Sequence, residues 1–168
     1  IEPTQSMISL TGNKHLFVLR SVGKFFGLAG IRLGFVSAHP CWLNIIAAGV
    51  GPWQVNGPAQ FIGEKALTDR IWQHQQRKTL TRLSNALESL LVDTFAKNVN
   101  GTSLFKTVKL DNAEQLFDQL CRQGVYVRLC DEKNALRFGV PNEQGLAVLA
   151  GVLSRRGSIL GCNSYTSD

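Results

Sequence analysis

Residues 19–35 read Leu-Arg-Ser-Val-Gly-Lys-Phe-Phe-Gly-Leu-Ala-Gly-Ile-Arg-Leu-Gly-Phe, and this stretch decides the fold. Its lysine, Lys24, lies in a glycine-rich connector between two apolar runs, residues 16–20 and 31–38. Both runs predict short buried strands, and near-continuous apolar strands are typical of α/β sheets covered on both faces. The connector has neither the Gly-Lys-Ser/Thr of a P-loop at the right distance from a first glycine nor the G-x-G-x-x-G of a dinucleotide fold.

The residue types around Lys24 suit an aldehyde that carries a phosphate. Ser21 lies three residues before the lysine and Arg32 eight residues after it. A lysine among apolar neighbours and beside another cation can act as an imine-forming amine, and an arginine fork binds phosphate with two hydrogen bonds. Pyridoxal phosphate needs both groups. By spacing alone, a loop lysine and an arginine paired at a strand end remain the simpler interpretation.

The composition narrows the class of protein. The chain has 168 residues, 44% of them hydrophobic and 18% charged, which excludes an intrinsically disordered chain. Its formal charge of +6 comes from scattered lysines and arginines, so no nucleic-acid partner is expected. No apolar stretch reaches the roughly 20 residues that span a bilayer, so no membrane partner is expected.

The cysteines and histidines predict no metal site. The four cysteines form no C-x-x-C pair, and the three histidines are isolated from one another in the sequence. We therefore expect reduced thiols in a cytoplasmic protein.

The rest of the chain predicts two layers of helix and strand. We expect a helix from about residue 40 to 48 and a long helical stretch over 56–92, with a break near 68–70. Beyond it, the pattern predicts strands at 103–110, 125–129 and 135–139 and helices at 112–122 and 143–154. We place a domain boundary after residue 95, a small α/β domain over 96–157, and a flexible tail over 158–168.

The stretch around Lys24 resembles the cofactor-lysine motif of fold-type I pyridoxal-phosphate enzymes, in the class I/II aminotransferase group. That motif reads Ser/Thr-x-x-Lys-x-Phe-Gly-Leu-Ala-Gly-x-Arg-x-Gly. The resemblance implies that Lys24 forms the Schiff base with the cofactor, and that Ser21 and Arg32 bind its phosphate. It also implies a fold: residues 1–95 would be the C-terminal part of a large cofactor-binding domain, including its interdomain helix.

The resemblance continues over nearly the whole chain, in the segments 51–59, 101–105, 124–128 and 136–141. It implies that Arg137 binds the carboxylate of the substrate and that Arg128 helps to hold its anionic end. A solvent-facing strand arginine is the plainer interpretation of either residue. The family further implies a phosphorylated amino-acid substrate and a homodimer.

Two departures from the family pattern bear on function. Aminotransferases of this branch usually carry serine where this chain has Gly23, and the glycine version is more similar to the threonine-phosphate decarboxylases of cobalamin biosynthesis. We therefore expect decarboxylation of L-threonine O-3-phosphate, with an aminotransferase of the histidinol-phosphate type as the alternative. Only 23 residues precede Lys24, which leaves no room for the aspartate that pairs with the cofactor ring. We therefore expect the C-terminal half of such an enzyme, and a catalytically inactive fragment that acts only by association is a further alternative.

Overall fold

The computed structural model describes residues 6–160, with side chains as far as residue 155. The chain forms two compact units, residues 1–74 and 75–168, which divide within one long helix, α3 (Arg70–Phe95). Each unit is described by itself below. The boundary predicted after residue 95 stays a prediction. The predicted tail falls partly on helix, since residues 158–160 end α5, and otherwise lies outside the described residues.

The first unit is built on two short antiparallel strands. Strand β1 (Val18–Ser21) pairs with β2 (Gly34–Ser37), and the register places Ser21 opposite Gly34. Large apolar side chains of both strands are exposed to solvent, since Leu19 of β1 is 78% exposed and Phe35 of β2 is 44% exposed. The expectation of strands covered on both faces is therefore not met within residues 6–160, where these two strands pair only with each other.

Strand β2 begins later than its apolar pattern predicts. The residues Ala29–Ile31 form a 3-10 turn, η3, and Arg32 then takes a left-handed conformation with φ 56°. A left-handed residue cannot continue a strand ladder, so pairing starts only at Gly34. A second 3-10 turn, η2 (Met7–Leu10), precedes β1.

Three helices follow, and their ends agree with the sequence signals. Helix α1 (Pro40–Val50) and helix α2 (Gly57–Thr68) both carry proline in the first turn, where its missing N–H costs nothing. Asn56 caps α2 by accepting the Ala59 N–H at 2.8 Å. The predicted break near 68–70 is confirmed at Asp69, whose carboxylate accepts the N–H of Trp72 at 2.9 Å and so starts α3 anew.

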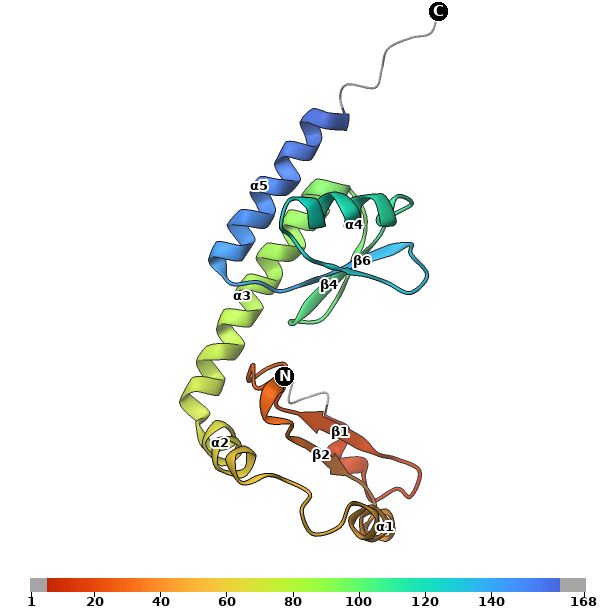
Figure 1. The fold of residues 1–168 in the computed structure, drawn as a ribbon, viewed down its shortest axis with the longest axis vertical. Coiled ribbons are helices and arrows are strands. Elements are labelled where there is room, and N and C mark those ends of the chain that lie inside the picture. Colours follow the sequence, from red (N-terminus) through yellow and green to blue (C-terminus); the bar gives the residue numbers. More distant parts are fainter. Residues whose placement is uncertain (1–5, 161–168) are drawn as a thin grey trace, which may run out of the picture. The chain divides into compact units, whose positions relative to one another are not determined.

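The second unit is a four-stranded antiparallel sheet with helices on one face (Figure 1). The strand order is β3-β4-β6-β5, formed by β3 (Val99–Gly101), β4 (Phe105–Lys109), β6 (Ala135–Gly139) and β5 (Arg128–Leu129). Along the chain, helix α4 (Ala113–Arg122) connects β4 to β5, and helix α5 (Glu143–Leu160) follows β6. The mixed helix and sheet confirms the α/β class.

One face of this sheet forms the core. Val108, Leu136 and Phe138 are all at most 1% exposed, and they pack with leucines of all three helices. These helix residues are Leu87 and Leu91 of α3, Leu116 and Leu120 of α4, and Leu149 and Leu153 of α5. Because side chains alternate along a strand, the intervening residues of β4 and β6 point to the opposite, helix-free face.

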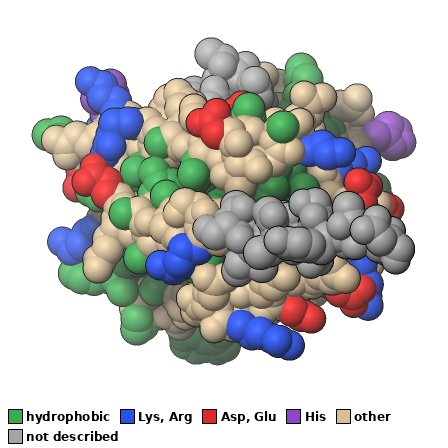
Figure 2. All heavy atoms as spheres, turned by 90° about the horizontal axis from the view of Figure 1, so that it is seen from above, with side chains coloured by type: hydrophobic (Ala, Val, Ile, Leu, Met, Phe, Trp, Pro, Cys, Tyr) green, Lys and Arg blue, Asp and Glu red, His purple; other side chains and the backbone are tan. Residues whose placement is uncertain are grey.

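The surface agrees with the scattered charges of the sequence. Figure 2 shows lysine and arginine side chains at several places on the drawn face, together with acidic and apolar ones. Over the described part of the chain, no helix is both long and apolar enough to cross a membrane.

Candidate functional site

The predicted cofactor lysine lies in a tight turn between β1 and β2. Gly27, with φ +68°, donates its N–H to the Lys24 carbonyl at 3.1 Å, and the Leu28 N–H reaches the Val22 carbonyl at 3.1 Å. Val22 is 1% exposed and anchors the start of the turn in the first unit. The Ser21 hydroxyl accepts the Gly23 N–H at 3.1 Å, so it stands at the mouth of the turn with its own proton free to donate.

Lys24 and Arg32 both extend from this turn into solvent. Arg32 donates one guanidinium N–H to the Ala29 carbonyl at 3.2 Å, and its other N–H groups remain available as donors. Neither side chain pairs with an acid among residues 6–155. No aspartate or glutamate occurs anywhere from residue 3 to residue 63. The segment is therefore electropositive without local neutralisation, which favours an anionic ligand.

The donor set of the turn fits pyridoxal phosphate. A phosphate needs several donors, and here Ser21 offers a hydroxyl and Arg32 a guanidinium, both carried by the same short loop. The cofactor aldehyde needs a free amine, and Lys24 has one.

The departure at Gly23 has no steric cause. A Cβ built on this residue would lie 3.4 Å from the Ala29 Cα and from the Ser21 Oγ, which is ordinary van der Waals contact. The turn thus accepts a Cβ at this position without a clash. The backbone at residue 23 therefore does not require a glycine.

The two predicted substrate arginines lie directly opposite each other in the second unit. The register pairs Arg128 of β5 with Arg137 of β6, and Arg137 with Thr107 of β4. Side chains of directly opposed residues share one sheet face, with Cβ atoms about 5 Å apart. Since Leu136 and Phe138 face the helices, both arginines occupy the helix-free face.

Two neighbours of these arginines were not anticipated from the sequence. The guanidinium of Arg137 lies 5.0 Å from the ring centroid of Phe105, a cation–π contact on the same sheet face. Arg128 approaches Asp131 at 3.6 Å, but 95% of that aspartate side chain is exposed. The alternation of β4 could have placed Phe105 on the arginine face; its contact with Arg137 depends on a register that the sequence does not show.

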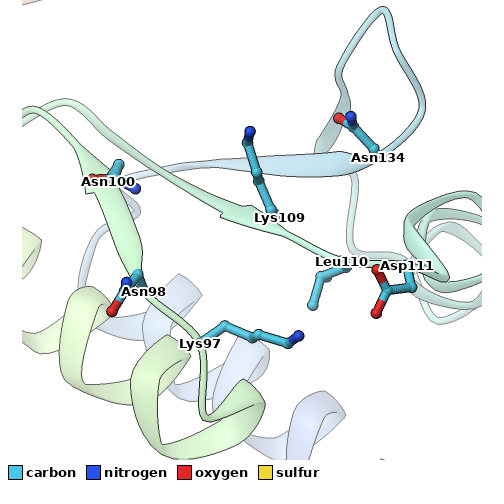
Figure 3. Close-up of a pocket in the computed structure, with 7 residues that line it drawn as sticks. All are labelled: Lys97, Asn98, Asn100, Lys109, Leu110, Asp111 and Asn134. Carbon is cyan, nitrogen blue, oxygen red and sulfur yellow. The ribbon is translucent and has the colours of Figure 1, made fainter.

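A hollow in the second unit contains none of the predicted residues (Figure 3). Its lining consists of Lys97, Asn98, Asn100, Lys109, Leu110, Asp111 and Asn134. All of these except Leu110 are exposed, and the figure shows the Lys97 amine directed toward Leu110 and Asp111 while Lys109 extends another way. The polar groups do not converge on one point, so the hollow is not a candidate active site.

Comparison with known proteins identifies related sequences. The family model of the class I and II aminotransferases matches residues 2–153. A threonine-phosphate decarboxylase of Pseudomonas aeruginosa is 39% identical over 142 residues, which cover 84% of this chain and 43% of that protein. A histidinol-phosphate aminotransferase of Haemophilus influenzae strain PittEE is 30% identical over 131 residues, covering 75% of this chain and 37% of that protein. The chain therefore spans less than half the length of these relatives.

Solved structures share the fold. A histidinol-phosphate aminotransferase from Clostridium acetobutylicum superposes with a TM-score of 0.86 at 21% identity, covering 94% of this chain and 51% of that one. Another, from Sinorhizobium meliloti in complex with pyridoxal-5'-phosphate, gives a TM-score of 0.71 at 19% identity, covering 88% of this chain and 42% of that one. At such identities the likeness concerns the fold alone.

Proposed function

Because the chain belongs to the class I and II aminotransferase family of pyridoxal-phosphate-dependent enzymes, we propose that it forms part of a decarboxylase. The reaction is the conversion of L-threonine O-3-phosphate to (R)-1-amino-2-propanol O-phosphate, a step of cobalamin biosynthesis. This chain contributes the cofactor lysine and the substrate arginines.

The opposed arginines carry the proposal. A substrate with a carboxylate and a phosphate bears up to three negative charges, and burying them requires matched cations. Arg128 and Arg137 present two guanidinium groups from adjacent positions of one sheet face. The higher identity to the Pseudomonas decarboxylase than to the Haemophilus aminotransferase supports the same choice.

Each residue of the lysine turn has a defined task. Arg32 and Ser21 would hold the cofactor phosphate, and the Lys24 amine would bond to the cofactor aldehyde. When bound, pyridoxal phosphate withdraws electrons from the substrate Cα and so weakens its bond to the carboxylate. The Lys24 amine, in its protonated form, would donate a proton to the substrate Cα in place of the lost carboxylate.

The activity, the substrate and the assembly concern the whole protein. The chain spans 43% of its Pseudomonas relative, and the homodimer and the cytoplasmic location predicted from the sequence stay proposals. We expect the isolated chain to bind the cofactor weakly and to turn over little or no substrate.

The decisive assay is product analysis with the complete protein. Incubation with threonine phosphate should release carbon dioxide without any 2-oxoglutarate. If turnover instead requires an oxo-acid acceptor and yields a new amino acid, the aminotransferase alternative, which the Haemophilus relative favours, replaces the proposal.

Cofactor binding provides an independent test of Arg32. Arg32→Lys replaces a two-pronged donor with a point charge, and losing one charge-assisted hydrogen bond costs about 1.5–3 kcal/mol, or roughly ten- to a hundredfold in affinity. Unchanged cofactor affinity would show that Arg32 is structural.

A further inference from the structure

Three aromatic rings meet beside the cofactor lysine. Phe25 and Phe26, which directly follow Lys24, contact each other edge to face with centroids 5.0 Å apart. Both also contact Trp72 in the first turn of α3: Phe25 edge-on at 5.6 Å and Phe26 stacked at 5.7 Å with planes 17° apart. We call Phe25, Phe26 and Trp72 the aromatic cluster. All three centroid distances lie within the 4.5–7 Å range of favourable ring pairs.

The backbone bonds of the turn do not explain where Lys24 lies. The bonds from Gly27 to Lys24 and from Leu28 to Val22 join residues of the same turn. These hydrogen bonds define the shape of the turn, but they do not connect the turn to a helix. The aromatic cluster supplies such an attachment, because Trp72 belongs to a helix whose start is fixed by the Asp69 cap.

The ring contacts restrict the backbone next to Lys24 and are not part of a buried core. Lys24 is exposed, so its own side chain contributes little to holding the turn. The next two residues are both tied to one indole, which restricts rotation of the backbone that carries the lysine. Trp72 itself is 36% exposed, so it does not belong to a deep core.

We propose that Trp72 is a positioning residue for Lys24: through Phe25 and Phe26 it holds the lysine turn in the orientation that receives the cofactor. The proposal rests on the proposed function, in which Lys24 bonds to the cofactor. Loss of the indole should leave the amine in place and lower the fraction of time it is correctly oriented. A displacement of about 1 Å can cost a hundredfold in rate, so we expect a loss of roughly ten- to a hundredfold.

The first test measures attachment of pyridoxal phosphate to Lys24. The complete protein is mixed with pyridoxal phosphate, reduced with borohydride at set times and mapped by mass spectrometry, with the other lysines as internal reference. Trp72→Leu should slow labelling of Lys24 selectively, and Trp72→Phe should restore most of it, since a ring can still stack. Trp53→Leu is the matched control, because Trp53 is 92% exposed.

The second test needs no cofactor. Hydrogen exchange of the Gly27 and Leu28 amides should accelerate in Trp72→Leu and return toward the original rate in Trp72→Phe, with the helical circular dichroism unchanged. If Trp72→Leu labels Lys24 and exchanges these amides as the unaltered chain does, the proposal is wrong.

The two tests separate the proposal from the function on which it rests. If pyridoxal phosphate shows no preference for Lys24 in the complete protein without substitutions, the cofactor role of Lys24 fails. The exchange rates then decide by themselves whether Trp72 holds the turn. If exchange accelerates while Lys24 labelling stays normal, Trp72 is structural only and the positioning role is refuted.

Discussion

Replacing Gly101 with alanine should destabilise the second unit more than any comparable glycine change. Gly101 has φ +156°, and a Cβ there would lie 2.2 Å from the Phe105 carbonyl oxygen and 2.9 Å from the Lys106 Cα. Both are backbone atoms of the neighbouring strand, so no side chain can rotate away. The change therefore moves β4, and with it the Phe105 ring that lies beneath Arg137.

The magnitude follows from two costs. An L-residue in a positive-φ conformation costs about 1–2 kcal/mol, and overpacking a fixed site adds about 1–3 kcal/mol. Gly101→Ala should thus lower the free energy of unfolding by about 2–5 kcal/mol. Gly124→Ala should lower the free energy of unfolding only by the backbone term of about 1–2 kcal/mol, since its φ is +78° and nothing lies within 4 Å of the added Cβ. Gly139→Ala, open and without positive φ, should stay within about 0.5 kcal/mol.

The assay is urea unfolding of the three variants, followed by far-UV circular dichroism. With a slope near 2 kcal/mol per molar urea, Gly101→Ala should shift the midpoint by roughly 1–2.5 M. Hydrogen exchange at β4 and β6 then locates the effect in the sheet. A Gly101 variant as stable as the Gly139 variant would refute the reasoning.

Three further outcomes can be checked. Phe105→Leu removes the ring beneath Arg137, a contact worth about 0.5–1 kcal/mol. Under the proposed function, the KM of the complete protein for threonine phosphate should therefore rise roughly two- to fivefold, while Phe105→Tyr should stay near the original value. Gly23→Ser meets only ordinary contacts and should keep the urea midpoint and cofactor attachment; loss of either would show that the turn excludes a side chain. The hydrogen bond and charge of Glu114 raise the pKa of Lys133 above 10.5, so this pair stabilises the fold below about pH 10.5 and its contribution is lost as the pH rises further. Glu114→Gln should therefore lower the thermal midpoint near pH 9, and the difference from the original protein should shrink as the pH rises above 10.5.

The sequence predicted helices and their boundaries well, because those signals are local. The break at Asp69 follows from one capping side chain, and β6 was predicted with its observed bounds. Strand β3 was missed, since its three residues include only one large apolar side chain, Val99. Strand β5 is shorter than predicted because the Val125 N–H closes the end of α4 on the Leu120 carbonyl and cannot join the ladder.

The site residues named from the sequence stay predictions, and their geometry could not be derived from the sequence. The motif around Lys24 could be recognised from letters alone, whereas the contacts of Trp72 with Phe25 and Phe26 join residues far apart in the chain. Strands were predicted over 125–129 and 135–139, and the structure pairs Arg128 with Arg137 across two antiparallel strands in these ranges. Their direct opposition is a matter of strand register, which a shift of one residue would have destroyed.

Because Arg128 and Arg137 lie directly opposite each other, the stability of the second unit should depend on whether an anion is bound between them. Two like charges placed directly across a strand pair repel, and the solvent-exposed carboxylate of Asp131, 3.6 Å from Arg128, offsets only part of this repulsion. An anion between the arginines turns repulsion into attraction, and ligand linkage then adds stability of about 2.7 kcal/mol at a hundred times the dissociation constant. The melting temperature of the second unit should therefore climb with dianion concentration in a saturable way, and neutralising either arginine should flatten that curve while raising the starting value in the absence of anions.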